Sequence, residues 1–162
     1  MKKEIIKDWI TEEGYRCVIR FNVLIGFRNG FIFIPYSDPA YIDDNLESYK
    51  GYDVHGGFAY QSAVNLVKDD DYPVKETRHG IWLGFDCGHI TDKPDYDYWR
   101  SIAENENDIN IIEKMFESER VIQKMNKNKK LKVWTTEDVV KELESLSKQF
   151  SEANKDEQKK QK

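Results

Sequence analysis

The spacing of apolar residues changes between the two halves of the chain, and this change most strongly limits the fold. In residues 16–25 and 31–34 the apolar side chains follow the two-residue period of β-strands. From about residue 111 onward they recur every three or four positions, as on one face of a helix. Strands followed by helices predict an α+β domain in which C-terminal helices cover an antiparallel sheet.

An N-terminal hairpin is predicted from residues 16–34. Asn29-Gly30 separates the apolar runs 16–25 and 31–34, and Pro35 closes the second run. Asn-Gly between two apolar runs is a strong hairpin signal, because both residues tolerate positive φ. We therefore expect the turn of the hairpin at Asn29-Gly30.

The first dozen residues have the spacing of a short helix. Their apolar residues are Ile5, Ile6, Trp9 and Ile10, and Gly14 supplies a stop. The pattern predicts one helix before the first strand.

The middle of the chain predicts two further strands between loops. A strand is expected over residues 52–60, with a bulge or close backbone approach at Gly56-Gly57. A second is expected over residues 80–86, with Ile81, Leu83 and Phe85 on one face. Residues 36–51 and 68–79 are predicted to be loops because they are polar and contain proline or glycine.

The second half predicts two helices. The first covers residues 111–125 on a stripe of Ile, Met and Phe, and a polar break follows at 126–130. Residues 131–134 are expected to be extended. Thr135 then caps a second helix, with Asp138 three residues later.

One domain is expected, because 162 residues provide a single core and little more. We assign residues 1–150 to an α+β domain and residues 151–162 to a flexible charged tail. No apolar run is long enough to cross a bilayer, and no signal peptide follows Met1. These features predict a cytoplasmic protein without a membrane partner.

The formal net charge of −5 argues against direct binding of nucleic acid, which depends on lysine and arginine. The acidic residues are clustered, and such clusters are usually solvated loops. Their alternative role is a surface that suits a basic protein partner. The candidate loops contain Asp43 and Asp44, and Asp69, Asp70 and Asp71.

A metal site is predicted at the rim of the sheet. Asp86 ends a strand, His89 follows three residues later, and Asp92 follows after three more. In a tight turn these side chains converge, and His55 arrives from a neighbouring strand. Imidazole nitrogen and carboxylate oxygen at tetrahedral corners suit zinc. The predicted ligands are His55, Asp86, His89 and Asp92.

Two alternatives remain open at this site. Cys87 is a rival to Asp92 as the fourth ligand, because a thiolate binds zinc well. Adjacent strand residues point to opposite faces, so Asp86 and Cys87 rarely bind the same ion, which favours Asp92. A His and an Asp near a glycine turn can also simply satisfy backbone groups. His79 is expected on the surface, and no nucleophile or phosphate-binding motif is present.

Two motifs resemble a family of small proteins that is widespread in phages and prophages. They are Tyr52-Asp53-Val54-His55-Gly56-Gly57 and the segment Trp82–Asp92, which fit the family patterns VHGG and W-x-GFDC-x-H-x-x-D. The resemblance covers roughly residues 14–150, but only these motifs are specific. The chain departs from the family at Cys17-Val18, where a Cys-Gly step is usual, and this bears on the register of the first strand.

The chain is also similar to the type II anti-CRISPR proteins of streptococcal prophages, which are zinc-containing inhibitors of the CRISPR effector nuclease. This resemblance implies that His55, Asp86, His89 and either Asp92 or Cys87 hold zinc. It also implies a protein partner, the effector nuclease, in the cytoplasm of the bacterial host. The oligomeric state stays open.

The alternative function is a small metal-dependent hydrolase. Such an enzyme needs an open coordination position and a nearby base. Glu76 is the candidate base from the sequence. Four protein ligands favour the inhibitor, whereas three protein ligands and a bound water are compatible with the hydrolase.

Overall fold

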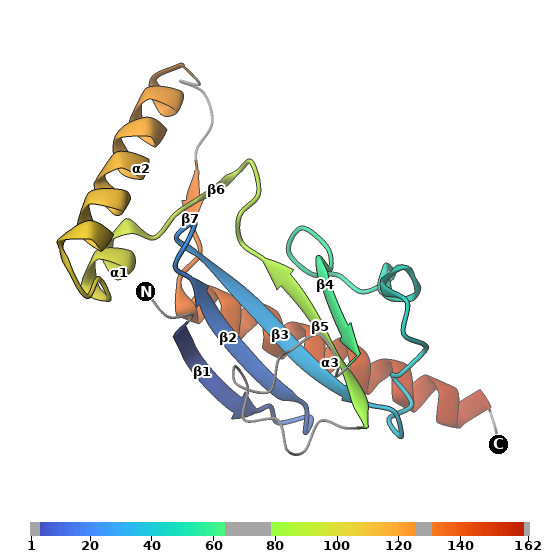
Figure 1. The fold of residues 1–162 in the computed structure, drawn as a ribbon. Coiled ribbons are helices and arrows are strands. Elements are labelled where there is room, and N and C mark those ends of the chain that lie inside the picture. Colours follow the sequence, from blue (N-terminus) through green and yellow to red (C-terminus); the bar gives the residue numbers. More distant parts are fainter. Residues whose placement is uncertain (1–3, 64–78, 126–130, 161–162) are drawn as a thin grey trace.

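The main sheet has five antiparallel strands in the order β1-β2-β3-β5-β4 (Figure 1). The structure is a computed structural model that describes residues 4–63, 79–125 and 131–160. The strands are β1 (Glu4–Ile10), β2 (Arg16–Asn22), β3 (Phe27–Pro35), β4 (Tyr60–Ala63) and β5 (Gly80–Asp86). The predicted α+β class with N-terminal strands is confirmed.

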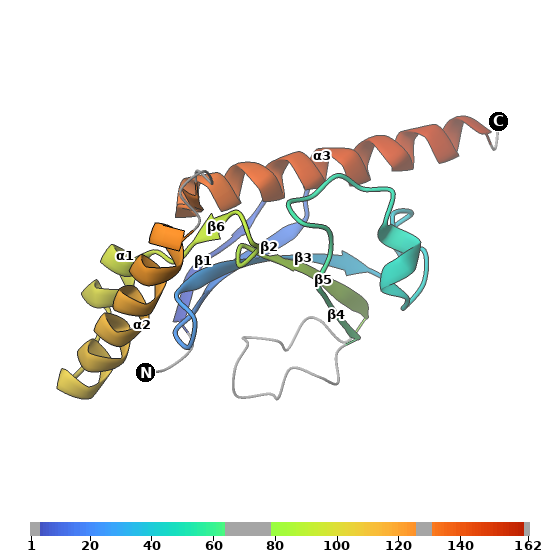
Figure 2. The same cartoon turned by 90° about the horizontal axis from the view of Figure 1, so that it is seen from above.

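The helices lie on one face and at one end of this sheet. Figure 2 shows α3 crossing one face, while α1 and α2 lie together beyond the end of the strands. The remaining elements are η1 (Leu46–Tyr49), β6 (Asp92–Lys93), α1 (Tyr96–Ser101), α2 (Glu106–Met125), β7 (Lys132–Val133) and α3 (Thr136–Lys160). Strands β6 and β7 pair in parallel. Among the described residues, no helix has the length and apolar character to span a bilayer.

The principal core lies between α3 and the sheet. The helix contributes four fully buried side chains at the predicted spacing: Val139, Leu143, Leu146 and Phe150. The sheet contributes Ile19, Ile32, Ile34, Ile81, Leu83 and Phe85, which are also fully buried. Burying each such side chain stabilises the fold by roughly 1.5–3 kcal/mol. The helical period therefore predicted both the helix and its buried face.

The start of α3 carries the predicted cap. The Asp138 backbone N–H donates to Thr135 Oγ1 at 3.2 Å, and the Thr135 backbone N–H donates to Asp138 Oδ2 at 3.0 Å. The two residues thus satisfy each other's free backbone donors at the helix end. This cap fixes the point where the chain leaves β7 and enters α3.

The turn of the β2–β3 hairpin lies at residues 23–26, so the prediction of a turn at Asn29-Gly30 is wrong. Asn22 pairs with Phe27, which leaves four residues to make the turn. Gly26 supplies the positive φ, +76°. The hairpin itself is present, displaced toward the N-terminus.

Gly30 instead lies within β3, where its missing side chain makes room for packing. A Cβ there would stand 2.6 Å from the ring of Phe85 and 3.1 Å from a methyl group of Val139. The glycine is therefore required by the close contact with β5 and α3. The Asn-Gly pair that predicted a turn instead serves this packing.

The N-terminal helix predicted before the first strand is also wrong, because Glu4–Ile10 forms strand β1. The register shifts between Ile5 and Lys7, so Ile6 is an extra residue in a β-bulge. The bulge brings Ile6 and Trp9, three positions apart, against the core. A bulged strand therefore produced the three-residue spacing of a helix.

Three further elements differ from the sequence prediction. Residues 52–59 form an irregular loop rather than a strand, and β4 begins only at Tyr60. Helix α1 was not predicted. The charged tail expected over residues 151–162 is helical as far as Lys160, and Asn154 Nδ2 donates to Tyr15 Oη at 3.1 Å.

The first helix predicted in the second half is present, but α2 begins at Glu106 rather than at residue 111. Within α2, Ile112 is fully buried whereas Ile111 is 48% exposed, so the buried stripe is centred one residue later than expected. Strand β7 confirms the short extended segment. His79 is exposed as expected, and the rest of the predicted loop at 68–79 lies outside the described residues.

Candidate metal centre

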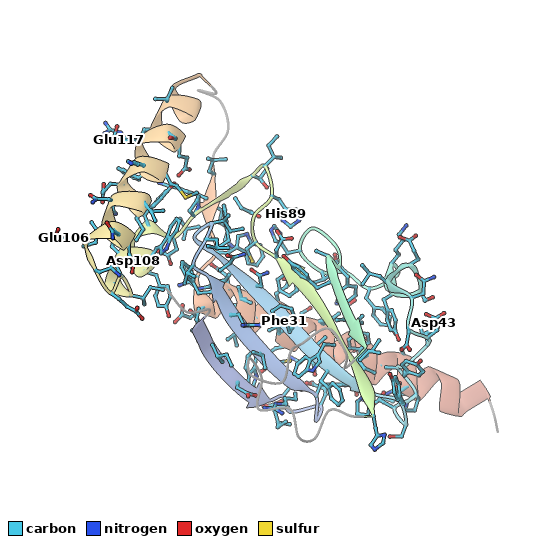
Figure 3. The ribbon with its side chains drawn as sticks, in the orientation of Figure 1. Phe31, Asp43, His89, Glu106, Asp108 and Glu117 are labelled. Atoms are coloured by element: carbon cyan, nitrogen blue, oxygen red, sulfur yellow. The ribbon has the colours of Figure 1, made fainter. Side chains whose placement is uncertain are left out.

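Three predicted ligands meet at one end of the sheet. His55 Nε2 lies 2.8 Å from Asp92 Oδ2, His89 Nδ1 lies 3.1 Å from the same oxygen, and the two nitrogens are 3.2 Å apart. These three residues form a group that can hold a metal ion. Figure 3 places His89 close to the end of β5.

The connection from β5 to β6 brings His89 and Asp92 together. The Asp92 backbone N–H donates to the His89 carbonyl at 2.8 Å, and the His89 backbone N–H donates to Asp92 Oδ2 at 2.9 Å. These two bonds close a tight turn over four residues. The i, i+3 spacing in the sequence correctly predicted that both side chains converge.

His55 reaches the same point from the loop before β4. The Gly57 backbone N–H donates to the Val54 carbonyl at 2.9 Å, which makes a turn around His55. The His55 backbone N–H donates to Glu142 Oε1 of α3 at 2.6 Å. The loop is thereby anchored to the helix on one side and directed at the β5–β6 turn on the other.

Gly56 allows this loop to approach the imidazole of His89. Its φ is +68°, and a Cβ there would stand 2.0 Å from Cε1 and Nε2 of His89. Gly57 also has positive φ, +82°, but a Cβ there would have no atom within 4 Å. Only Gly56 is required by the close packing at the centre.

Trp134 supports two of the three ligands. Its indole Nε1–H donates to Asp92 Oδ1 at 3.1 Å, and its ring lies 4.0 Å from that of His55 between centroids. Asp92 therefore presents one oxygen to the histidines while the other is held by the indole. Outer-shell partners of this kind orient metal ligands and tune their affinity. Sequence reasoning did not assign Trp134 this role.

Arg28 of β3 connects the segments that carry the site. Its side chain is only 4% exposed, pairs with Asp95 Oδ2 at 2.7 Å and donates to the Trp134 carbonyl at 2.9 Å. Its own carbonyl accepts the backbone N–H of Cys87 at 3.0 Å. A buried guanidinium needs such partners. Sequence reasoning also missed Arg28, and the one available signal was a charged residue within an apolar region.

The electrostatics favour a charged carboxylate at Asp92. Burial alone would raise the pKa of this carboxyl, but hydrogen bonds from His55 and from the backbone and ring of His89 outweigh it. The pKa of Asp92 is therefore held below its ordinary value. An ionised, well-oriented carboxylate is a good ligand for a divalent cation.

The spacing of the three donor atoms fits a small tetrahedral ion. Ligands about 2.0–2.1 Å from a zinc ion stand about 3.3 Å apart at tetrahedral corners. The three observed separations, 2.8 to 3.2 Å, are close to that edge length. Metal binding needs the lone pair of each facing nitrogen, so the imidazole proton must then occupy the other ring nitrogen.

Asp86 and Cys87 do not belong to this group of donors. Asp86 Oδ1 accepts the backbone N–H of Gly88 at 2.9 Å, so this carboxylate shapes the turn. Cys87 is buried in the principal core, and burial raises the pKa of its thiol. Its sulfur is not among the donor atoms that gather with His55, His89 and Asp92.

The candidate partner-binding loops are only partly within the described residues. Asp43 and Asp44 are exposed on the loop before η1, as Figure 3 shows for Asp43. Asp43 Oδ2 accepts the hydroxyl of Ser48 at 2.8 Å, and Asp44 Oδ1 accepts that of Tyr41 at 3.1 Å. Both carboxylates therefore also organise their own loop. Asp69, Asp70 and Asp71 lie outside the described residues.

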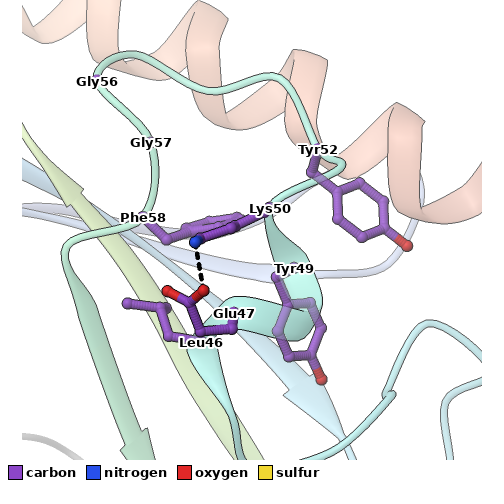
Figure 4. Close-up of a pocket in the computed structure, with 8 residues that line it drawn as sticks. All are labelled: Leu46, Glu47, Tyr49, Lys50, Tyr52, Gly56, Gly57 and Phe58. Carbon is purple, nitrogen blue, oxygen red and sulfur yellow. Dashed lines mark ion pairs between the residues drawn. The ribbon is translucent and has the colours of Figure 1, made fainter.

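A separate hollow of about 230 Å³ lies beside the Gly56-Gly57 turn (Figure 4). It is lined by Leu46, Glu47, Tyr49, Lys50, Tyr52, Gly56, Gly57 and Phe58. Glu47 and Lys50 form an ion pair within it. The glycine turn thus borders both this hollow and the ring of His89.

Comparisons with known proteins found no match for this chain. No family model matches the chain, and no curated protein or solved structure matches it. The resemblance to phage proteins therefore stays a prediction. What the chain contains is a His-His-Asp group able to hold a metal ion, at the end of an antiparallel sheet in an α+β domain.

Proposed function

We propose that this protein holds one zinc ion at His55, His89 and Asp92 and acts as an inhibitor that binds a type II CRISPR effector nuclease. The observation that carries the zinc assignment is the convergence of three donor atoms within 3.2 Å of one another. Two imidazoles and one carboxylate are a common zinc donor set. The same set also binds iron(II), so the metal must be identified directly.

Metal content tests the zinc assignment. We expect about one zinc per chain in the wild-type protein by elemental analysis, and little in His55→Ala or His89→Ala. His79→Ala is the matched control, because His79 is the one remaining histidine of the three in the chain. It is exposed and does not belong to this group. Equal zinc in all four proteins would reject the site.

Two features support the choice of partner. The motifs around His55 and His89 resemble those of phage proteins, and the net charge of −5 suits a protein with basic grooves for nucleic acid. A zinc ion in such an inhibitor has a structural role, because it ties the His55 loop to the β5–β6 turn. Metal binding then contributes to folding free energy.

A cleavage assay tests this half of the proposal. The protein is titrated against a type II effector nuclease loaded with its guide, and DNA cleavage is measured. Loss of cleavage at about one inhibitor per effector, weaker at higher salt, supports inhibition by binding. Normal cleavage with several such effectors at saturating protein would reject it.

The second candidate function is a metal-dependent hydrolase. The observation that favours it is that the group has three protein donors among the described residues, as in catalytic zinc sites. The candidate base Glu76 lies outside the described residues. Loss of effector activity at far below one molecule per effector, sensitive to chelation, would favour an enzyme over a stoichiometric inhibitor.

A further inference from the structure

Among the described residues, three protein donors gather at the centre and no fourth joins them. Within the described residues, His55, His89 and Asp92 are the residues whose donor atoms gather in this group. An ion bound by these three has one tetrahedral corner left over. No described side chain fills that corner, so it is available to a ligand.

The three ligands differ in how far they are exposed, which indicates where this corner lies. The side chain of Asp92 is 2% exposed, that of His55 is 19% exposed and that of His89 is 32% exposed. Asp92 is therefore the floor of the centre, held from below by Trp134. The imidazole of His89 is the most exposed of the three side chains, so we place the remaining corner next to it.

The charge of the centre selects the kind of molecule. A divalent ion with two neutral imidazoles and one carboxylate carries a net charge of +1, which attracts an anion. Glu142 lies close by, but its Oε1 atom already accepts the His55 backbone N–H at 2.6 Å. The charge of this neighbouring carboxylate opposes the attraction, so an anion is held mainly by direct bonding of its oxygen to the ion.

We propose that the metal centre has an accessible fourth position that binds a small anion with an oxygen donor, such as a carboxylate or hydroxamate. This inference rests on the proposed metal site but not on the proposed partner. It makes the centre a ligand-binding site in addition to its role of tying the His55 loop to the β5–β6 turn. The hydrolase requires such an exchangeable position, whereas an inhibitor with a structural ion does not.

Cobalt(II) in place of zinc makes the fourth position visible. The visible absorption of cobalt(II) depends on its ligands and their number, so the metal-loaded protein reports its own coordination. We expect bands of four-coordinate cobalt at one ion per chain, and a saturable shift of these bands when acetohydroxamate is added. The His79→Ala variant should give the same bands and the same shift.

The outcomes distinguish this inference from the metal site itself. Cobalt bands that do not change at saturating acetohydroxamate would overturn the open position while leaving metal binding intact. Absence of any bands at one cobalt per chain would overturn both. A shift that persists in His89→Ala would place the anion at some other metal and would also overturn the inference.

Discussion

The core beneath α3 and the metal centre are built by opposite means. In the core, Leu143 and its neighbours are apolar, fully buried and spaced by the helical period, so many weak contacts act together. At the centre, Asp92 and the two histidines depend on a few directed contacts between separate segments. Packing of apolar side chains therefore stabilises the domain, whereas a few directed polar contacts assemble the candidate metal centre.

The largest expected effect is in the core. Leu143→Ala should reduce the free energy of unfolding by roughly 3–5 kcal/mol, because it removes a buried side chain and leaves a cavity. Zinc per folded chain should not change, since Leu143 contributes no donor. Chemical denaturation and elemental analysis measure the two quantities. Loss of zinc from the folded variant would show that the two regions are coupled.

The next effect compares two neighbouring glycines at the centre. Gly56→Ala and Gly57→Ala share the strain of positive φ, about 1–3 kcal/mol. Only Gly56→Ala also drives a Cβ into the ring of His89, and this overlap adds about 1–3 kcal/mol. We expect Gly56→Ala to lose metal affinity and Gly57→Ala to keep it, measured by competition with a chelator. Equal affinities would mean that the loop shifts without disturbing His89.

A smaller effect is expected at the support of Asp92. Trp134→Phe keeps an aromatic ring against His55 but removes the indole N–H that binds Asp92 Oδ1. Metal affinity should fall by about 10- to 100-fold, as for other outer-shell partners of metal ligands. Isothermal titration with zinc measures this, and an unchanged dissociation constant would remove Trp134 from the centre.

The smallest effect is at the cap of α3. Thr135→Ala should cost about 1 kcal/mol of stability, because the Asp138 backbone N–H loses its acceptor. Burial alone would raise the pKa of Asp138, but hydrogen bonds from Thr135 and Lys132 hold it below its ordinary value. The stabilisation from the ionised Asp138 carboxylate is therefore present above the ordinary pKa of an aspartate. It is lost as the pH falls through the lowered pKa. In thermal melts across acid pH, the gap between the two proteins should narrow as Asp138 is protonated but stay open, because Thr135 Oγ1 does not titrate and accepts the Asp138 N–H at every pH in the wild type.

Much of the fold was predictable where the signal is local. The strand at Gly80–Asp86 and the helix that follows Thr135 were expected with correct starts, because their patterns are carried by consecutive residues. The turn at Asn29-Gly30 failed, since a glycine in a sequence does not say whether it serves a turn or a close contact with Phe85. The bulge at Ile6 failed for a similar reason, because it mimics helical spacing.

For the candidate metal centre, the residue types were predictable from the sequence, whereas the packed fold selects which of them meet. The three-residue spacing of His89 and Asp92 is local, so their convergence in one turn could be predicted. His55 and Trp134 lie 37 and 42 residues from Asp92, and Arg28 lies 106 residues from Trp134. Such contacts exist only after the sheet and α3 have packed, because the free chain has no local bond that holds these segments together. Packing likewise turned Asp86 toward its own loop and enclosed Cys87 in the core, while it brought His55, His89 and the buried Asp92 together.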